Sequence, residues 1–163
     1  MATVVIGDLF AAPCQAIAHQ CNCVTTRSKH LAADVFKHYP YANVYSNRRS
    51  PDQPGTVKVC TASEQYSHAH QQSPVVFSLL AQYYPGGHNA TNDTPSMREA
   101  WFVQCLSHTR DYVMKHSITS IAFPWCIGCG SAGGDWSKYH TMIDKFATEV
   151  PLCQVFIYRL PNM

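Results

Sequence analysis

The chain has 163 residues, of which 46% are apolar and 13% are charged, and its formal net charge is +2. This composition can form a buried core and excludes a disordered polypeptide, and the length favours a single domain. A charge this small, without a basic stripe, argues against nucleic acid as a partner. The apolar stretch Val75–Ala81 is far shorter than the ~20 residues of a membrane span, and no secretory leader precedes Asp8. We therefore expect a soluble, cytoplasmic protein without a membrane partner.

The eight cysteines need an interpretation of their own. Four disulfides would suit a secreted chain, but no secretion signal is present. The alternative is a zinc site, suggested by the pairs Cys21 and Cys23 and Cys126 and Cys129 with His19 close by, although no second pair has zinc-finger spacing. We expect reduced cysteines that pack as small apolar side chains, with no metal and no cofactor.

The first half of the chain is predicted to contain four strands and one helix. The strands are β-branched or apolar runs bounded by turn residues, at Thr3–Ile6, Ala16–Cys21, Gly55–Val59 and Pro74–Leu80. Ser28 can cap the helix and Pro40 stops it. Its apolar residues recur at helical spacing, at Leu31, Val35, Phe36 and Tyr39. The polar stretch Tyr41–Pro54 is predicted to be a surface loop.

The second half is predicted to contain two longer helices and two strands. After an exposed loop at Tyr83–Asn92, Thr94 offers an N-cap and Pro95 a first helical position. Asp135 caps the last helix. The buried stripes of the two helices are Met97, Trp101, Cys105, Leu106 and Val113, and then Tyr139, Met142, Ile143 and Phe146. The strands are Ile118–Phe123, closed by Pro124, and Val155–Tyr158. This alternation predicts an α/β sandwich with helices packed on a mixed sheet.

The segment Pro124–Trp136 joins a strand to a helix and is rich in glycine. Without Cβ atoms the backbone can approach a ligand closely, and successive amides together with a helix N-terminus attract an anion such as phosphate. It is not a Walker loop, because no Gly-Lys-Ser/Thr follows, nor a dinucleotide fingerprint, which lies near the first strand. The segment therefore predicts phosphate binding, with a plain connector of small residues as the alternative.

A second polar segment, Ile17–Lys29, begins in the second strand and continues beyond it. Polar side chains with little charge suit a sugar, and ligands of open α/β sheets lie beyond the carboxyl ends of strands. This segment and the glycine-rich one are expected to face one crevice. His19 has the alternative of a hydrogen-bonded core residue. Asp8, after the first strand, either accepts from an exocyclic amine or caps a turn.

Three motifs, in this order, resemble those of macrodomains: Gly7–Phe10, Ala18–Cys23 and Ile127–Trp136. The resemblance extends from Val4 to about Leu160. The sequence most resembles stand-alone phage, viral and fungal proteins described as ADP-ribose 1″-phosphate phosphatases. The terminal ADP-ribose glycohydrolases are more distant relatives in this resemblance. It implies a three-layer α/β/α macrodomain over residues 1–163, with ADP-ribose or ADP-ribosylated targets as partners. A viral chain would act in the host cytoplasm or nucleus.

The resemblance also implies the roles of particular residues. Asp8 would contact the adenine amine beside the backbone of Leu9, and Tyr158 would lie against the adenine face. Asn22 would bond to the distal ribose. The diphosphate would lie against a loop formed by Gly128, Cys129, Gly130, Ser131, Ala132 and Gly133.

The chain departs from its relatives at two places near the distal ribose. Many relatives carry a Gly-x-Gly-Ile-Ala loop, where this chain has Arg27–Ala32 without a glycine. The glycohydrolase group is thought to use a lysine after the central strand and an aspartate in the glycine loop. The matching positions hold Gln82 and Tyr83, and Ala132, so we do not expect a covalent lysyl mechanism.

We expect hydrolysis of ADP-ribose derivatives at the distal ribose, releasing phosphate or an attached group. The candidates for the group that orients or deprotonates water are His19, His30 and Asp135; histidine in general suits acid–base work near neutral pH. The alternative is a non-catalytic ADP-ribose reader, which the two departures favour and the lack of a partner domain disfavours. Single-stranded RNA binding through Tyr83, Tyr84 and Trp125 is a weaker hypothesis at this net charge.

Overall fold

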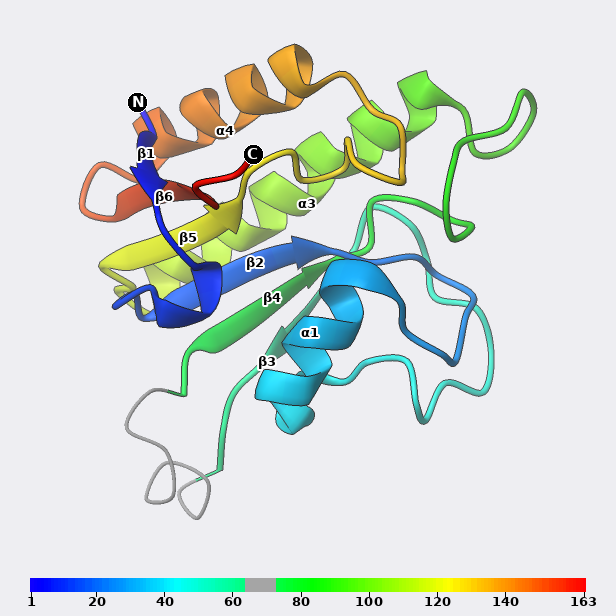
Figure 1. Ribbon diagram of the computed structural model, residues 1–163, viewed down its shortest axis with the longest axis horizontal. Helices are drawn as coiled ribbons and strands as arrows, with labels where there is room; N and C mark the ends of the chain where they lie inside the picture. Colours follow the sequence, from blue (N-terminus) through cyan, green and yellow to red (C-terminus); the bar gives the residue numbers. More distant parts are fainter. Residues whose placement is uncertain (64–72) are drawn as a thin grey trace.

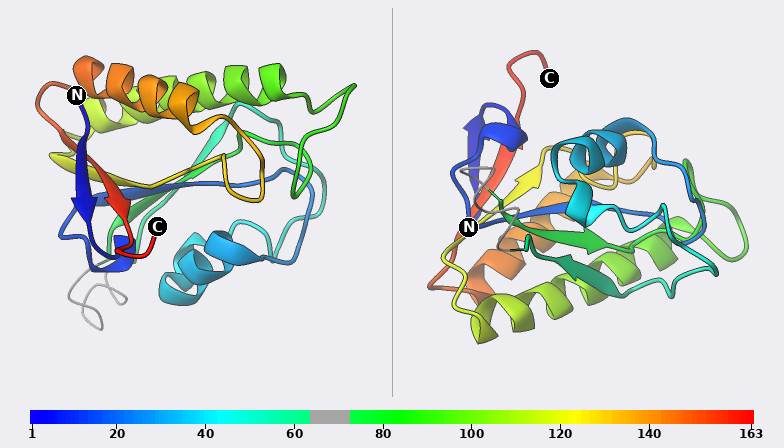
Figure 2. Two further views of the ribbon diagram at one scale, coloured as in Figure 1. Left: turned by 45° about the horizontal axis from the view of Figure 1, so that its top comes forward. Right: turned by 90° about the horizontal axis from the view of Figure 1, so that it is seen from below.

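The computed structural model describes residues 1–63 and 73–163, which form a sheet between two layers of helices (Figure 1). Helices α3 and α4 cover one face and α1 covers the other, as Figure 2 shows from two further sides. The strands are β1 (Thr3–Ile6), β2 (Ala16–Gln20), β3 (Val57–Cys60), β4 (Val75–Leu79), β5 (Ser120–Pro124) and β6 (Gln154–Arg159). The helices are α1 (His30–His38), α3 (Pro95–Lys115) and α4 (Trp136–Glu149), with 3-10 turns η1 (Leu9–Ala11) and η2 (Pro40–Ala42). The predicted three-layer sandwich is confirmed.

The strand order, over the part of the chain that the structure describes, is β1-β6-β5-β2-β4-β3. All neighbouring pairs are parallel except β3 with β4, so the sheet is mixed, as predicted. Five strands therefore end at the same edge of the sheet, and the loops that follow them meet there. This edge holds all three motifs on which the resemblance depends.

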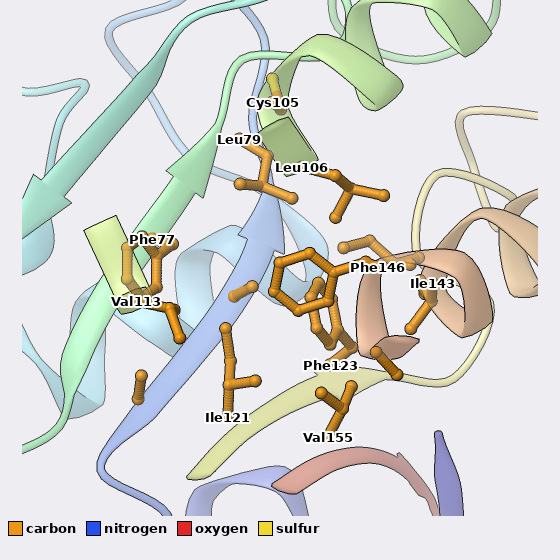
Figure 3. Packing of buried hydrophobic residues seen from close by; sticks show 14 of the residues in the cluster. Phe77, Leu79, Cys105, Leu106, Val113, Ile121, Phe123, Ile143, Phe146 and Val155 are labelled. Carbon is orange, nitrogen blue, oxygen red and sulfur yellow. The ribbon is translucent and has the colours of Figure 1, made fainter. Parts of the chain in front are cut away.

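Strand residues alternate between the two faces because successive side chains of a strand point in opposite directions. On β2, Ala16 and Ala18 face α3 and α4, whereas Ile17 faces α1. Figure 3 shows how the first face packs, with sheet residues against residues of α3 and α4. The labelled residues are Phe77, Leu79, Ile121, Phe123 and Val155 from the sheet, and Cys105, Leu106, Val113, Ile143 and Phe146 from the helices.

Helix α1 begins without a side-chain cap. Its N-cap is Lys29, which makes no side-chain capping bond, so the prediction of Ser28 as the cap is wrong. His30, the first helical residue, has a φ of 55°, the left-handed region that few residues other than glycine adopt. The chain turns into the helix through this residue rather than through a serine cap.

Two further expectations need correction. The stretch Tyr41–Pro54 is not simply a surface loop, because Tyr45 is only 3% exposed and packs beneath α1. In the first half of helix α3 the buried stripe is shifted by one residue, with Arg98 and Phe102 enclosed in place of Met97 and Trp101. Farther along the helix the stripe is buried as predicted, at Cys105, Leu106 and Val113. Thr94 and Asp135 do cap α3 and α4, through bonds from the amides of Met97 at 3.2 Å and Ser137 at 3.0 Å. Within the described residues no helix has the length and apolar character needed to cross a membrane.

The register of α3 gives a direct test of the core. Phe102→Ala should lower the free energy of unfolding by about 3–5 kcal/mol, because it leaves a cavity against Tyr139. Its neighbour Val103 is 46% exposed, so Val103→Ala should change stability by less than about 0.5 kcal/mol. Urea unfolding of both variants measures this, and equal losses would contradict the register.

Candidate functional site

The candidate site lies where the chain leaves adjacent strands in opposite directions. After β2 the chain enters α1 on one face of the sheet, and after β5 it enters α4 on the other face. Because β2 and β5 are neighbours, the two loops diverge at one point of the sheet edge, and open α/β sheets bind ligands at such a point. Both loops carry sequence-predicted site residues.

Tyr158 lies at this edge, next to Gly7, which precedes Asp8, and next to the first residues of the glycine-rich segment. The amide of Gly7 donates to the carbonyl of Arg159 at 2.9 Å, and the amide of Trp125 donates to the carbonyl of Tyr158 at 2.8 Å. A Cβ added to Gly7 would lie 3.6 Å from the Tyr158 ring. Asp8 is exposed, and one carboxylate oxygen caps η1 by accepting from the Phe10 amide at 2.9 Å. The second oxygen remains for a ligand.

The glycine-rich loop is held by short backbone hydrogen bonds that leave several amides unused. The amides of Cys129, Gly133 and Gly134 donate to the carbonyls of Cys126, Gly130 and Gly128 at 2.9–3.1 Å. In the described part of the chain, three consecutive amides have no acceptor, those of Gly130, Ser131 and Ala132. Such a run of unpartnered N–H groups before a helix N-terminus suits an anion.

The glycines of this loop serve different purposes. A Cβ on Gly128, whose φ is +74°, would lie 2.7 Å from the Tyr139 ring and 2.8 Å from Oε1 of Gln20. A Cβ on Gly134 would lie 2.5 Å from a backbone oxygen. These two glycines are therefore required by packing. Gly130, by contrast, has nothing within 4 Å of an added Cβ, so the protein itself does not require a glycine there.

A buried guanidinium fixes the position of this loop. Arg98, on α3, is 2% exposed and pairs with Asp93 through bonds of 2.7 and 2.6 Å. Its remaining hydrogens reach the carbonyl of Ala132 at 3.2 Å and that of Gly86 at 2.8 Å. Burial opposes ionisation of Asp93, but hydrogen bonds from Arg98 and the Tyr84 amide prevail and lower the pKa of that carboxyl. Arg98 thus ties the loop after β4 to the glycine-rich loop.

Asn22 shapes the loop that follows β2. It is 7% exposed, and its Oδ1 accepts from the amides of Val24 at 3.0 Å and Thr25 at 2.9 Å. Its Nδ2 donates to the hydroxyl of Tyr45 at 3.1 Å. The Cys23 amide donates to the carbonyl of Tyr83 at 2.9 Å, which joins this loop to the one after β4.

The three predicted catalytic side chains are not brought together. His19 is fully buried under α1, where it bonds to Ser78 at 3.0 Å, and burial lowers its pKa to about 3. It is a neutral core histidine, the alternative given by the sequence. Asp135 lies at the start of α4 and lines a cavity of about 180 Å³ on the α3–α4 side, with His88 and Lys138. His30 is exposed at the start of α1, on the opposite side of the sheet.

A larger hollow, of about 480 Å³, lies over β6 toward the opposite edge of the sheet. It is lined by Cys14, Ser120, Gln154 and Phe156, and it includes Tyr158 from the candidate site.

All eight cysteines are free thiols. Within residues 1–63 and 73–163, no group of three or more His, Cys, Asp or Glu side chains is placed to hold a metal ion.

No family model and no curated protein matches the sequence, but solved structures match the fold. The macrodomain of Mycobacterium tuberculosis DarG superposes with a TM-score of 0.78 and 20% identity over 97% of both chains. The macrodomain of Thermus aquaticus DarG gives 0.75 and 19% over 98% of both. The chain has the macrodomain fold. Thermosipho africanus DarTG in complex with ADP-ribose gives 0.74 and 21% identity over 97% of this chain and 41% of that one.

Several residues that build the site in this macrodomain fold were missed from the sequence. Arg98 occupies a buried position of the α3 stripe, one turn before Phe102, and a charge at such a position signals a buried partner. Gln20 ends β2 and donates to Oε1 of Gln82 at 2.8 Å, while its own buried Oε1 has no partner. Tyr45 and Arg48 come from a polar segment that gave no such signal.

The buried ion pair predicts how stability depends on pH. Because the pKa of Asp93 is lower in the folded state, its stabilising effect is complete above its unfolded value of about 4 and is lost as the pH falls through the folded value. Asp93→Asn should lower the free energy of unfolding by about 3–5 kcal/mol at pH 7, since it leaves Arg98 buried without a counter-charge. The difference in free energy of unfolding between wild type and variant, measured in urea, should shrink toward pH 3. A difference that stays constant with pH would contradict this role.

Proposed function

We propose that this protein binds ADP-ribose at the carboxyl edge of its sheet, as one macrodomain spanning residues 1–163. The observation that carries the proposal is the run of unpartnered amides at Gly130, Ser131 and Ala132 in the loop after β5. The exposed carboxylate of Asp8 follows β1 at the same edge of the sheet. The amides suit a diphosphate, and the carboxylate suits the exocyclic amine of adenine. Tyr158 offers an aromatic ring next to Gly7.

The similar structures support the choice of ligand. Two of them were solved with it: Thermosipho africanus DarTG in complex with ADP-ribose, and a glycine-to-valine mutant of the Oceanobacillus iheyensis macrodomain with ADPR, which matches at a TM-score of 0.67 and 17% identity. The protein supplies backbone dipoles rather than a lysine at the loop, so it selects a diphosphate by shape as much as by charge.

We further propose that the protein hydrolyses ADP-ribose derivatives at the distal ribose, of the kind that ADP-ribose 1″-phosphate phosphatases accept. Among the three candidate side chains, only His30 is both exposed and placed at the start of α1, next to the Asn22 loop. Its imidazole would take a proton from water as the water oxygen bonds to C1″ of the distal ribose and the bond from C1″ to the phosphate or conjugate breaks. It would then return the proton to that leaving group. ADP-ribose with a free 1″-hydroxyl is the other product.

An ADP-ribose reader without turnover is the second candidate function. It is favoured by the burial of His19, which removes one of the three candidates for the acid–base step. It is also favoured by the capping role of Asp135, one of whose carboxylate oxygens accepts from the Ser137 amide. The two functions share the same binding site and differ in whether the bound ADP-ribose derivative is hydrolysed.

Substitution of Gly130 tests the binding site. Gly130→Ala should leave the free energy of unfolding within about 1 kcal/mol of wild type, because its Cβ meets no protein atom, yet reduce ADP-ribose affinity by about tenfold or more. The Cβ would stand in the space that the diphosphate occupies. The matched control is Gly87→Ala, which also meets nothing within 4 Å and lies outside the loop. Calorimetric titration of both measures this, and equal affinities would contradict the proposed diphosphate site.

Substitution of His30 tests turnover. Glycine adopts the φ of 55° without strain, so His30→Gly removes the imidazole and keeps the backbone. Turnover of ADP-ribose 1″-phosphate or of mono-ADP-ribosylated protein should fall by about 10²–10⁴, with ADP-ribose affinity changed less than about threefold. His108→Ala, at an exposed position of α3, is the control. Unchanged turnover removes His30 from the mechanism, and tight binding without product from the wild type leaves the reader function.

A further inference from the structure

We propose that Tyr45 and Arg48 are positioning residues that hold Asn22 as a hydrogen-bond donor toward the distal ribose. The inference deepens the proposed function and rests on the binding of ADP-ribose. Both residues come from the segment between α1 and β3, and both reach back to the loop after β2. That segment also donates the Asp52 amide to the carbonyl of Cys23 at 2.8 Å, so the two loops are joined along their length.

Tyr45 holds Asn22 through two bonds to one oxygen. Its hydroxyl accepts from the backbone amide of Asn22 at 2.8 Å and from Nδ2 of the same residue at 3.1 Å. The ring is 3% exposed and lies edge-on to Phe36, with ring centroids 5.2 Å apart. Burial is the main cause that raises the pKa of Tyr45, so the hydroxyl stays neutral and protonated. The oxygen therefore remains an acceptor in a fixed place.

Arg48 fixes the two ends of the same turn. Its guanidinium donates to the carbonyl of Asn22 at 2.9 Å and to the carbonyl of Thr25 at 2.8 Å. Asp52 accepts from the other side of the guanidinium at 3.0 and 2.9 Å, which balances its charge. The guanidinium also lies 4.7 Å from the centroid of the Tyr45 ring. A planar fork with several donors can make these contacts at once, which a lysine cannot.

These contacts determine which end of the Asn22 carboxamide is left for a ligand. Oδ1 is already used inside the turn by the amides of Val24 and Thr25 and by the Thr25 hydroxyl at 3.1 Å. Nδ2 carries two hydrogens, of which Tyr45 takes one. The second has no acceptor among the residues that the structure describes. Asn22 can therefore donate to a ribose hydroxyl oxygen, and it does so only while Tyr45 and Arg48 keep the turn in place.

The test compares two ligands that differ in the distal ribose. ADP carries adenine, one ribose and the diphosphate, so the ratio of ADP-ribose affinity to ADP affinity isolates the contact with the distal ribose. Tyr45→Phe removes only the hydroxyl, and it should weaken ADP-ribose by about tenfold and leave ADP unchanged in calorimetric titrations. The matched control is Tyr41→Phe, which removes the bond from a tyrosine of the same segment to the Pro74 carbonyl at 2.6 Å. The ratio of ADP-ribose affinity to ADP affinity in this control should equal that of wild type.

A second variant covers the possibility that Tyr45→Phe does not fold. Arg48→Lys keeps the positive charge but loses the forked guanidinium donors. It should lower the ratio of ADP-ribose affinity to ADP affinity, while ADP affinity stays within about twofold of wild type. Equal weakening of both ligands, or of neither, overturns the positioning role while ADP-ribose binding stands. A wild-type protein that binds neither ADP-ribose nor ADP overturns the proposed function and this inference with it.

Discussion

The candidate site depends on one buried guanidinium. Arg98 is almost fully enclosed, and its positive charge is balanced by Asp93 at the end of the loop after β4. Its remaining donors bind carbonyl oxygens of two separate loops, at Gly86 and Ala132. Buried charges are tolerated only when paired and hydrogen-bonded, so this arrangement leaves the loops little freedom. The unpartnered amides of the glycine-rich loop are thereby fixed before any ligand arrives, which reduces the ordering cost of binding.

A second constraint is the turn that leads from Asn22 into α1. Here the chain has no glycine where many macrodomains have two, and Ser28 does not cap the helix. His30 takes the left-handed conformation that a glycine would supply, with a φ of 55°. A histidine in this conformation is uncommon, and such strain is frequent at functional sites. His30 therefore combines a backbone conformation that favours glycine with an exposed imidazole at the start of α1.

The sequence predicted the order and type of the elements well, because β-branched runs, helical spacing and caps such as Thr94 and Asp135 are local signals. It also predicted that the segments following β1, β2 and β5 lie at one edge of the sheet, because parallel strands end at one edge. It could not place Arg98, Tyr45 or Arg48, whose roles come from contacts between segments far apart in the chain. Nor could it separate His19 from the exposed candidates, since only the position of α1 over β2 buries that side chain.

The central claim is that the free amides of the glycine-rich loop bind the diphosphate of ADP-ribose while Asp8 lies at the other end of the same ligand. Titration of ¹⁵N-labelled protein with ADP-ribose, followed by amide chemical shifts, tests it most directly. The account predicts saturable shifts at Gly130, Ser131 and Ala132 together with Gly7 and Asp8, with one shared dissociation constant below about 1 mM. Shifts confined to one of these two regions, or no saturation at millimolar ligand, would contradict it.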